Sequence, residues 1–143
     1  MKARVQWLDG RAFVGESGSG HAVVMDGSAE AGGRNIGVRP MEMLLLGLGG
    51  CTAFDVVMIL EKGREKIAAC DIELEAERAA TEPKVFTHVK MHYRLKGHNL
   101  KPAAIERAIK LSAEKYCSAT AMFEKTAKIE YSWTVEEEEA IAS

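Results

Sequence analysis

The first part of the chain alternates apolar and polar positions over short stretches, which is typical of half-buried strands. Residues 3–8 place Val5 and Trp7 on one side, and Asp9-Gly10 then gives a hairpin signal. A Gly-rich, aperiodic stretch follows and predicts a loop about as long as loops without structure usually become. We therefore predict strands at residues 3–8, 11–16 and 21–25, and a loop at 26–39.

A long apolar segment after this loop predicts a buried helix over residues 40–62. Pro40 suits the first turn of a helix, and Gly63 suits the position just after its end. Only Glu42 and Asp55 carry charge between Pro40 and Leu60, and a helix that is apolar on nearly every face is a buried one. Three glycines weaken this helix by about 1 kcal/mol each. We interpret them as allowing close approach of another backbone or a pocket, at positions 47, 49 and 50.

The remaining sequence predicts two long strands, helical segments and a final strand. The two strands form a hairpin with one wet face, and Ile105, Ala108, Ile109 and Ser112 form one stripe of the following helix. The predicted strands cover 71–78, 85–95 and 128–135, and the helical segments cover 102–116 and 117–125. This order of elements predicts the α+β class, with no linker or repeat and one domain spanning residues 1–143.

The composition indicates the cellular compartment and the kinds of partner more clearly than it indicates an activity. The chain has 143 residues, and its net charge of −2 provides no basic surface for nucleic acid. Three cysteines favour a reducing compartment with free or functional thiols. The first residues lack the apolar core of a signal peptide. The uncharged stretch 43–54 is too short to span a bilayer. We therefore expect a cytoplasmic protein with no membrane partner.

The three cysteines are the candidates for chemistry. Cys51 lies in the middle of the apolar helix, and it is either a reactive thiol or an ordinary buried one. Asp55 follows one turn later and would oppose ionisation of Cys51 if charged, whereas the glycine and leucine neighbours predict an apolar pocket. Cys117 lies at a helix junction, where backbone amides could point at its sulfur. Cys70 has no motif around it, and we interpret it as structural.

With these cysteines in place, the chain resembles the OsmC/Ohr family of thiol-dependent peroxidases over nearly its whole length. The resemblance is carried by RPMEMLLLGLGGCTA around Cys51, by LSAEKYCS around Cys117, and by the order of elements. The stretches GESGSGH and CTAFDVV resemble the YhfA-like branch of the family. The resemblance implies an OsmC-like fold, in which antiparallel sheets wrap around two central helices in an intertwined homodimer.

The resemblance also implies a two-cysteine mechanism. Cys51 would attack an organic hydroperoxide and become a sulfenic acid, and Cys117 would condense with it to a disulfide. A dithiol reductant would then reset the site. The family's catalytic arginine is matched in position by Arg11, with Arg34 and Arg39 as rivals. Its glutamate is replaced by Met41, and Glu42 is the nearest carboxylate, which would otherwise serve as a favourable charge in the first helical turn.

Two other functions stay open. The chain could be a non-catalytic dimer that binds an apolar ligand beside Cys51, or a dithiol–disulfide exchanger with no peroxide step. We expect no cofactor, because the sequence has no dinucleotide, phosphate-loop or hydrolase motif. We expect no metal either, because Cys51 and Cys117 have no histidine at the spacing of a zinc site.

Overall fold

The computed structural model describes residues 1–139, and these form two compact units. The first unit ends at Leu46 and the second begins at Gly47, so the boundary falls inside one helix, α1 (Pro40–Lys62). Mixed α+β architecture is confirmed. The predicted single domain stays a prediction, and its last part, residues 140–143, lies outside the described residues.

The first unit contains a small antiparallel sheet of β1 (Ala3–Asp9), β2 (Ala12–Ser17) and β3 (Ala22–Met25). All three strands begin and end within one residue of the predicted positions. Trp7 pairs with Phe13, and Phe13 pairs with Met25 across the sheet. The predicted turn after β1 contains Gly10 at a φ of +53°, a left-handed conformation that glycine adopts without strain.

The loop between β3 and α1 is ordered by one buried carboxylate, that of Asp26. Its Oδ1 accepts the backbone N–H of Gly27 at 2.7 Å, and its Oδ2 accepts those of Arg34 at 3.0 Å and Ile36 at 3.4 Å. A short 3-10 helix, η1 (Ala29–Ala31), lies within the segment that these bonds hold. The predicted long loop is therefore a structured turn, because one side chain satisfies several backbone donors at once.

Opposing effects act on the pKa of Asp26. Burial raises the pKa, whereas the hydrogen bonds from Arg34, Gly27 and Ile36 and the charge of Arg34 lower it. The net shift is downward from the usual value of 3.8, because amide donors favour the charged form.

The second unit contains a three-stranded sheet in the order β4-β5-β6, formed by β4 (Lys66–Arg78), β5 (Phe86–His98) and β6 (Lys128–Glu137). The β4–β5 pair is antiparallel, as predicted, but β5 and β6 are parallel. The expectation of antiparallel sheets thus holds for every pair except this one. The reason is the helical crossover between β5 and β6, which returns the chain to the same end of the sheet.

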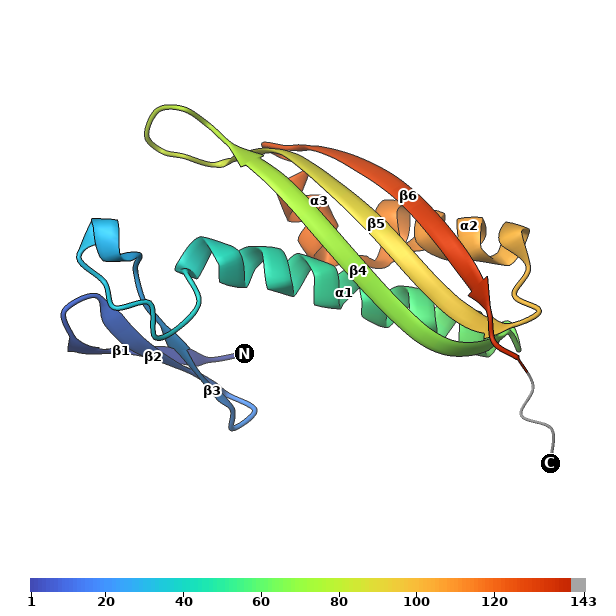
Figure 1. Cartoon of the computed structure of the whole chain (residues 1–143), viewed down its shortest axis with the longest axis horizontal. Helices are drawn as coiled ribbons and strands as arrows, with labels where there is room; N and C mark the ends of the chain where they lie inside the picture. The colour runs from blue at the N-terminus through green and yellow to red at the C-terminus, as the bar shows by residue number, and fades with distance from the viewer. Residues whose placement is uncertain (140–143) are drawn as a thin grey trace. The chain divides into compact units, whose positions relative to one another are not determined.

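Helices cover one face of this sheet. Figure 1 shows α2 (Pro102–Leu111), α3 (Ser118–Phe123) and the second half of α1 on that face. The predicted stripe of α2 is buried, and it faces a core to which β5 and α1 contribute most of the large side chains. The fully or nearly fully buried apolar residues of β5 and α1 are Val89, Met91, Tyr93, Leu95, Leu48, Val56 and Leu60.

The main differences from the sequence prediction concern β4, the start of β5 and the end of α2. β4 begins at Lys66 rather than residue 71, so Cys70 lies inside the strand. Phe86 is buried and Val85 is exposed, because a register shift between Glu77 and Arg78 changes which side chains face the core. The helix predicted to reach residue 116 ends as an α-helix at Leu111 and continues as a single π turn, η2 (Ser112–Tyr116).

The Asp26 contacts predict acid sensitivity of the first unit. Because the folded pKa is lowered, the stabilisation is present above the unfolded value near 3.8 and is lost as pH falls through the lower folded value. We expect the Gly27 and Arg34 amides to lose protection against hydrogen exchange in that range, as measured by NMR relative to the intrinsic exchange rate at each pH. Asp26→Asn should give fast exchange already at neutral pH. Glu30→Gln, which changes an exposed carboxylate of the same loop, is the control, and equal effects of both variants would contradict the assignment.

Candidate functional site

Cys51 and Cys117 lie close together in the second unit. Their sulfur atoms and a carboxylate oxygen of Asp55 all lie within 4.8 Å of one another. Cys51 is half-buried in the middle of α1, whereas Cys117 is 3% exposed and Asp55 is 8% exposed. The fold therefore places two thiols and one carboxylate at a single point, with Cys51 the more accessible of the two thiols.

The π turn η2 positions Cys117. The backbone N–H of Cys117 donates to the carbonyl of Ser112 at 2.8 Å. A hydrogen bond between residues five positions apart defines a π turn. Cys117 is then the residue that caps α3, and its Sγ accepts the N–H of Thr120 at 3.3 Å. The prediction that amides would point at this sulfur agrees with that contact.

Burial is the main influence on the pKa of the Cys117 thiol and raises it. The hydroxyl and the backbone amide of Thr120 lower the pKa, and the nearby Cys51 raises it again. The net shift is upward, so Cys117 is a thiol rather than a thiolate at neutral pH.

A buried chain of hydrogen bonds leads to the carboxylate of Asp55. The hydroxyl of Thr52 lies 2.7 Å from that of Tyr93 and 2.9 Å from that of Ser112. Ser112 donates to Asp55 Oδ2 at 3.0 Å. Burial raises the pKa of Tyr93, against the Thr52 hydrogen bond that lowers it, so this phenol stays protonated. This chain of hydrogen bonds holds Asp55 beside both thiols.

Sequence reasoning found Asp55 only as a neighbour of Cys51 and did not find the other three members. Ser112 belongs to the predicted apolar stripe of the helix after β5, where it counts as a packing residue, and neither Thr52 nor Tyr93 is singled out by the sequence. A hydroxyl at a buried position was the available signal, since buried polar groups need hydrogen-bond partners. No pattern in the sequence shows that these hydroxyls, which come from three separate elements, meet in the fold.

Arg11 and Glu42, the other two predicted catalytic residues, belong to the first unit, and Cys51 and Cys117 belong to the second. The exposed Glu42 accepts the backbone N–H of Arg39 at 2.7 Å through Oε1, which satisfies a free donor at the start of α1. Arg11 is exposed, and its guanidinium donates to the carbonyl of Gly10 at 3.3 Å. Their catalytic roles stay predictions, and the contacts of Glu42 agree with its alternative role in the first helical turn.

The rival arginines also have structural partners. Arg34 pairs with Asp9, and Arg39 donates to the side chain of Asn35 at 2.8 Å. Each of these guanidinium groups thus contributes to the order of the first unit.

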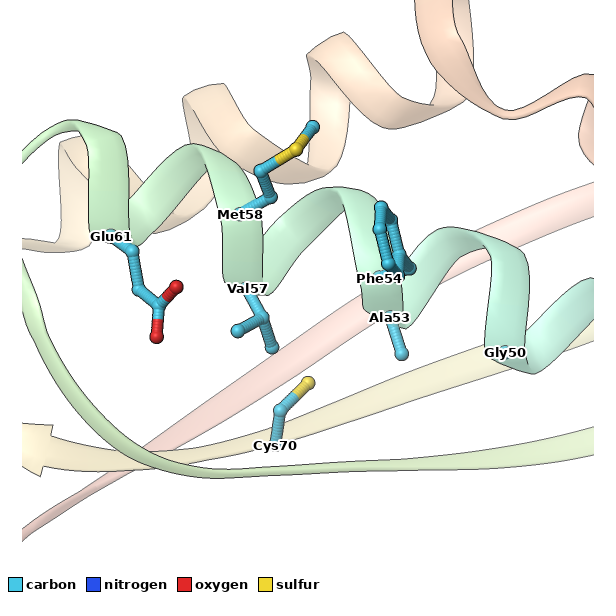
Figure 2. Close-up of a pocket in the computed structure, with 7 residues that line it drawn as sticks. All are labelled: Gly50, Ala53, Phe54, Val57, Met58, Glu61 and Cys70. Atoms are coloured by element: carbon cyan, nitrogen blue, oxygen red, sulfur yellow. The ribbon is translucent and has the colours of Figure 1, made fainter.

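An apolar groove of about 500 Å³ lies between α1 and β4. Figure 2 shows Ala53 and Val57 of α1 above Cys70 of β4, with Phe54 and Met58 directed to the other side of the helix. The predicted pocket beside Cys51 is therefore matched by a groove beside Cys70 instead. Burial, and then the charge of Asp71, raises the pKa of Cys70, so this thiol is protonated at neutral pH. The lining residues are Gly50, Ala53, Phe54, Val57, Met58, Glu61 and Cys70.

Comparison with known proteins identifies the family. The model of the OsmC-like protein family matches residues 32–132. Protein YhfA of Escherichia coli (strain K12) is 47% identical over 135 residues, which cover 94% of this chain and 98% of YhfA. The chain belongs to the OsmC-like family, as the resemblance around Cys51 and Cys117 implied. Membership of this family supports a redox function.

Solved structures show the same fold. A hypothetical protein from Aquifex aeolicus VF5 is 30% identical, with a TM-score of 0.84, and the match covers 96% of this chain and 97% of that one. An organic hydroperoxide resistance protein OsmC from Legionella pneumophila is 18% identical, with a TM-score of 0.72 over 94% of this chain and 96% of that one. The fold is therefore shared with proteins far apart in sequence.

Removal of Ser112 from the hydrogen-bond chain should destabilise the protein. Ser112→Ala leaves the buried Asp55 carboxylate without its donor, and we expect a loss of about 1.5–3 kcal/mol in the free energy of unfolding. Urea denaturation followed by circular dichroism measures this. Ser118→Ala, an exposed serine six residues later, should change stability by less than about 0.5 kcal/mol. A Ser112→Ala variant as stable as this control would show that the contact contributes nothing.

Proposed function

We propose that this protein is a homodimeric, thiol-dependent redox enzyme that reduces organic hydroperoxides through two cysteines, in oxidative-stress defence in the cytoplasm. One observation carries the proposal: Cys51 and Cys117 come within 4.8 Å of one another although they are far apart in the sequence. Family membership supports it. The Legionella pneumophila protein of the same fold is named for organic hydroperoxide resistance.

In the proposed reaction, the Cys51 thiolate attacks the terminal oxygen of a hydroperoxide. The O–O bond breaks, the terminal oxygen stays on the sulfur with its hydrogen as a sulfenic acid, and the alkoxide leaves as the alcohol by taking up the proton that the Cys51 thiol released. The Cys117 sulfur then attacks the Cys51 sulfur, a disulfide forms and water leaves. A dithiol reductant donates two electrons and two protons and restores both thiols. Capture by a thiol this close protects Cys51 from further oxidation.

The accessibility of the two thiols supports the assignment of roles. Cys51 is half-buried, so a small substrate can reach its sulfur from outside. Cys117 is buried, and its raised pKa keeps it protonated until a partner sulfur is within reach. The attacking thiol is therefore Cys51 and the resolving thiol is Cys117.

Asp55 contributes a carboxylate beside the two thiols. Asp55 is on the same helix as Cys51, one turn later, and Ser112 holds it in place. A negative charge there opposes formation of a thiolate, so the activating cation must come from another part of the assembly. Arg11 stays the proposed source, and Glu42 its proposed partner.

The homodimer is supported by the surface of α1. In the isolated chain Leu44, Leu46 and Phe54 are 51%, 57% and 70% exposed. The helix is long and apolar enough to cross a membrane, and only 33% of its most apolar window is buried. Because members of this family are soluble proteins, we propose that a second copy of the chain covers this surface. Large apolar side chains left exposed on a helix suit a surface that associates with another chain.

The apolar groove beside Cys70 favours one alternative function, the binding of an apolar ligand without turnover. Its lining residues are apolar apart from the Cys70 thiol and the Glu61 carboxylate, so an alkyl chain would fit its chemistry. A ligand-binding dimer would show no faster reaction with hydroperoxide than free cysteine does.

A thiol count tests the proposed reaction. Mixing the reduced protein with cumene hydroperoxide should remove two of the three thiols per chain, and a thiol-reactive dye measures the loss. Cys51→Ser should abolish the reaction. Cys117→Ser should leave a sulfenic acid on Cys51 that a dimedone probe labels. Cys70→Ser is the matched control and should react like the wild type. A rate no faster than that of free cysteine would refute the peroxidase function.

A charge on α1 tests the dimer. Phe54→Glu should raise the dissociation constant of the dimer about 100-fold or more, because an unpaired buried carboxylate costs several kcal/mol. Sedimentation velocity over a concentration series measures this. Met122→Glu, at an exposed apolar residue of α3 that is 68% accessible, should leave the dimer intact. A wild-type protein that sediments as a monomer at high concentration would contradict the proposal directly.

A further inference from the structure

The three side chains that converge in the site are of types that commonly bind metal ions. Cys51 and Cys117 offer sulfur and Asp55 offers a carboxylate oxygen, and these atoms lie within 4.8 Å of one another. We propose that the reduced protein binds one thiophilic divalent cation, such as Zn²⁺, through these three residues. From the sequence we expected no metal, because no histidine lies at the spacing of a zinc site. The third candidate ligand is instead a carboxylate, Asp55, one helical turn from Cys51.

The spacing fits a tetrahedral ion. Two Zn–S bonds of about 2.3 Å at the tetrahedral angle put the sulfur atoms about 3.8 Å apart, and a carboxylate oxygen binds at about 2.0–2.2 Å. Because the ligand atoms already lie within 4.8 Å of one another, rotation of the side chains needs to bring the two sulfur atoms at most about 1 Å closer to reach this separation. Three protein ligands leave the fourth position to water, as in open zinc sites.

The surroundings orient the carboxylate. Ser112 donates to Asp55 Oδ2, and Ser112 is itself held by the Thr52 hydroxyl. Support of this kind outside the ligand shell fixes ligands and strengthens metal binding. Within residues 1–139, Ser112 is the one side chain that hydrogen-bonds Asp55, and no basic side chain forms an ion pair with it. The other carboxylate oxygen is thus available to a cation.

Charge and access favour the same occupant. Two thiolates and a carboxylate would place three negative charges in a buried site, and a divalent cation offsets two of them. Cys51 is half-buried, so the ion has a path to the site. Binding releases one proton from each thiol to solvent and transfers no electron. A disulfide holds the sulfurs about 2.05 Å apart and removes both thiolates, so oxidation excludes the ion.

The test is a titration of the reduced dimer with Co²⁺ or Cd²⁺, followed by sulfur-to-metal charge-transfer absorption and by competition with Zn²⁺. We expect one ion per chain. Cys51→Ser and Cys117→Ser should abolish the absorption, and Ser112→Ala should weaken binding about 10–100-fold. Asp55→Asn should weaken it by at least as much. Cys70→Ser is the control, because Cys70 is a thiol of the same unit outside the cluster, and it should leave affinity unchanged.

A second measurement needs no variant. The wild-type protein oxidised with diamide should lose the charge-transfer signal and release the ion, and a dithiol should restore binding. Retention of the ion after oxidation, or equal affinity in Asp55→Asn and the wild type, would overturn the proposal. The thiol count with hydroperoxide is made on metal-free protein, so failure of the peroxidase function leaves this result unaffected.

Discussion

The hydrogen-bond chain from Tyr93 through Thr52 and Ser112 to Asp55 is the constraint on which the rest of the second unit depends. It joins the central strand, the long helix and the π turn at the level where the two thiols meet. Apolar contacts can slide, but hydroxyls with buried partners have one arrangement in which all are satisfied. The chain of hydrogen bonds therefore sets the position of α1 on the sheet, and this position places Cys51 opposite Cys117.

The π turn links this hydrogen-bond chain to the position of Cys117. Ser112 takes part in the buried network through its side chain and accepts the N–H of Cys117 through its carbonyl. One residue thus holds both the carboxylate and the backbone of the second thiol. An uninterrupted α-helix would carry Cys117 around its axis and away from Cys51, so the local irregularity brings the cysteines together.

Much of the fold could be predicted from hydrophobic pattern, and the site only in part. The bounds of α1 followed from Pro40, Gly63 and the apolar run between them, because helix ends have local chemical signals. Cys51 and Cys117 were candidates from the residues alone, and their separate roles followed from the resemblance. The parallel pairing of β6 was missed because pairing direction depends on the crossover. Thr52 and Ser112 were missed because a buried hydroxyl looks like a packing residue until its partner on another element is known.

The long sequence separations within the site have a consequence for folding. The bonds of Thr52 to Tyr93 and Ser112 span 41 and 60 residues, and that of Ser112 to Asp55 spans 57. Contacts of such range require the closure of long loops, which slows folding. A chain emerging from the ribosome exposes Cys51 well before Cys117 has been synthesised. The paired thiols are thus a property of the completed chain, because Cys117 must be synthesised before it can meet Cys51.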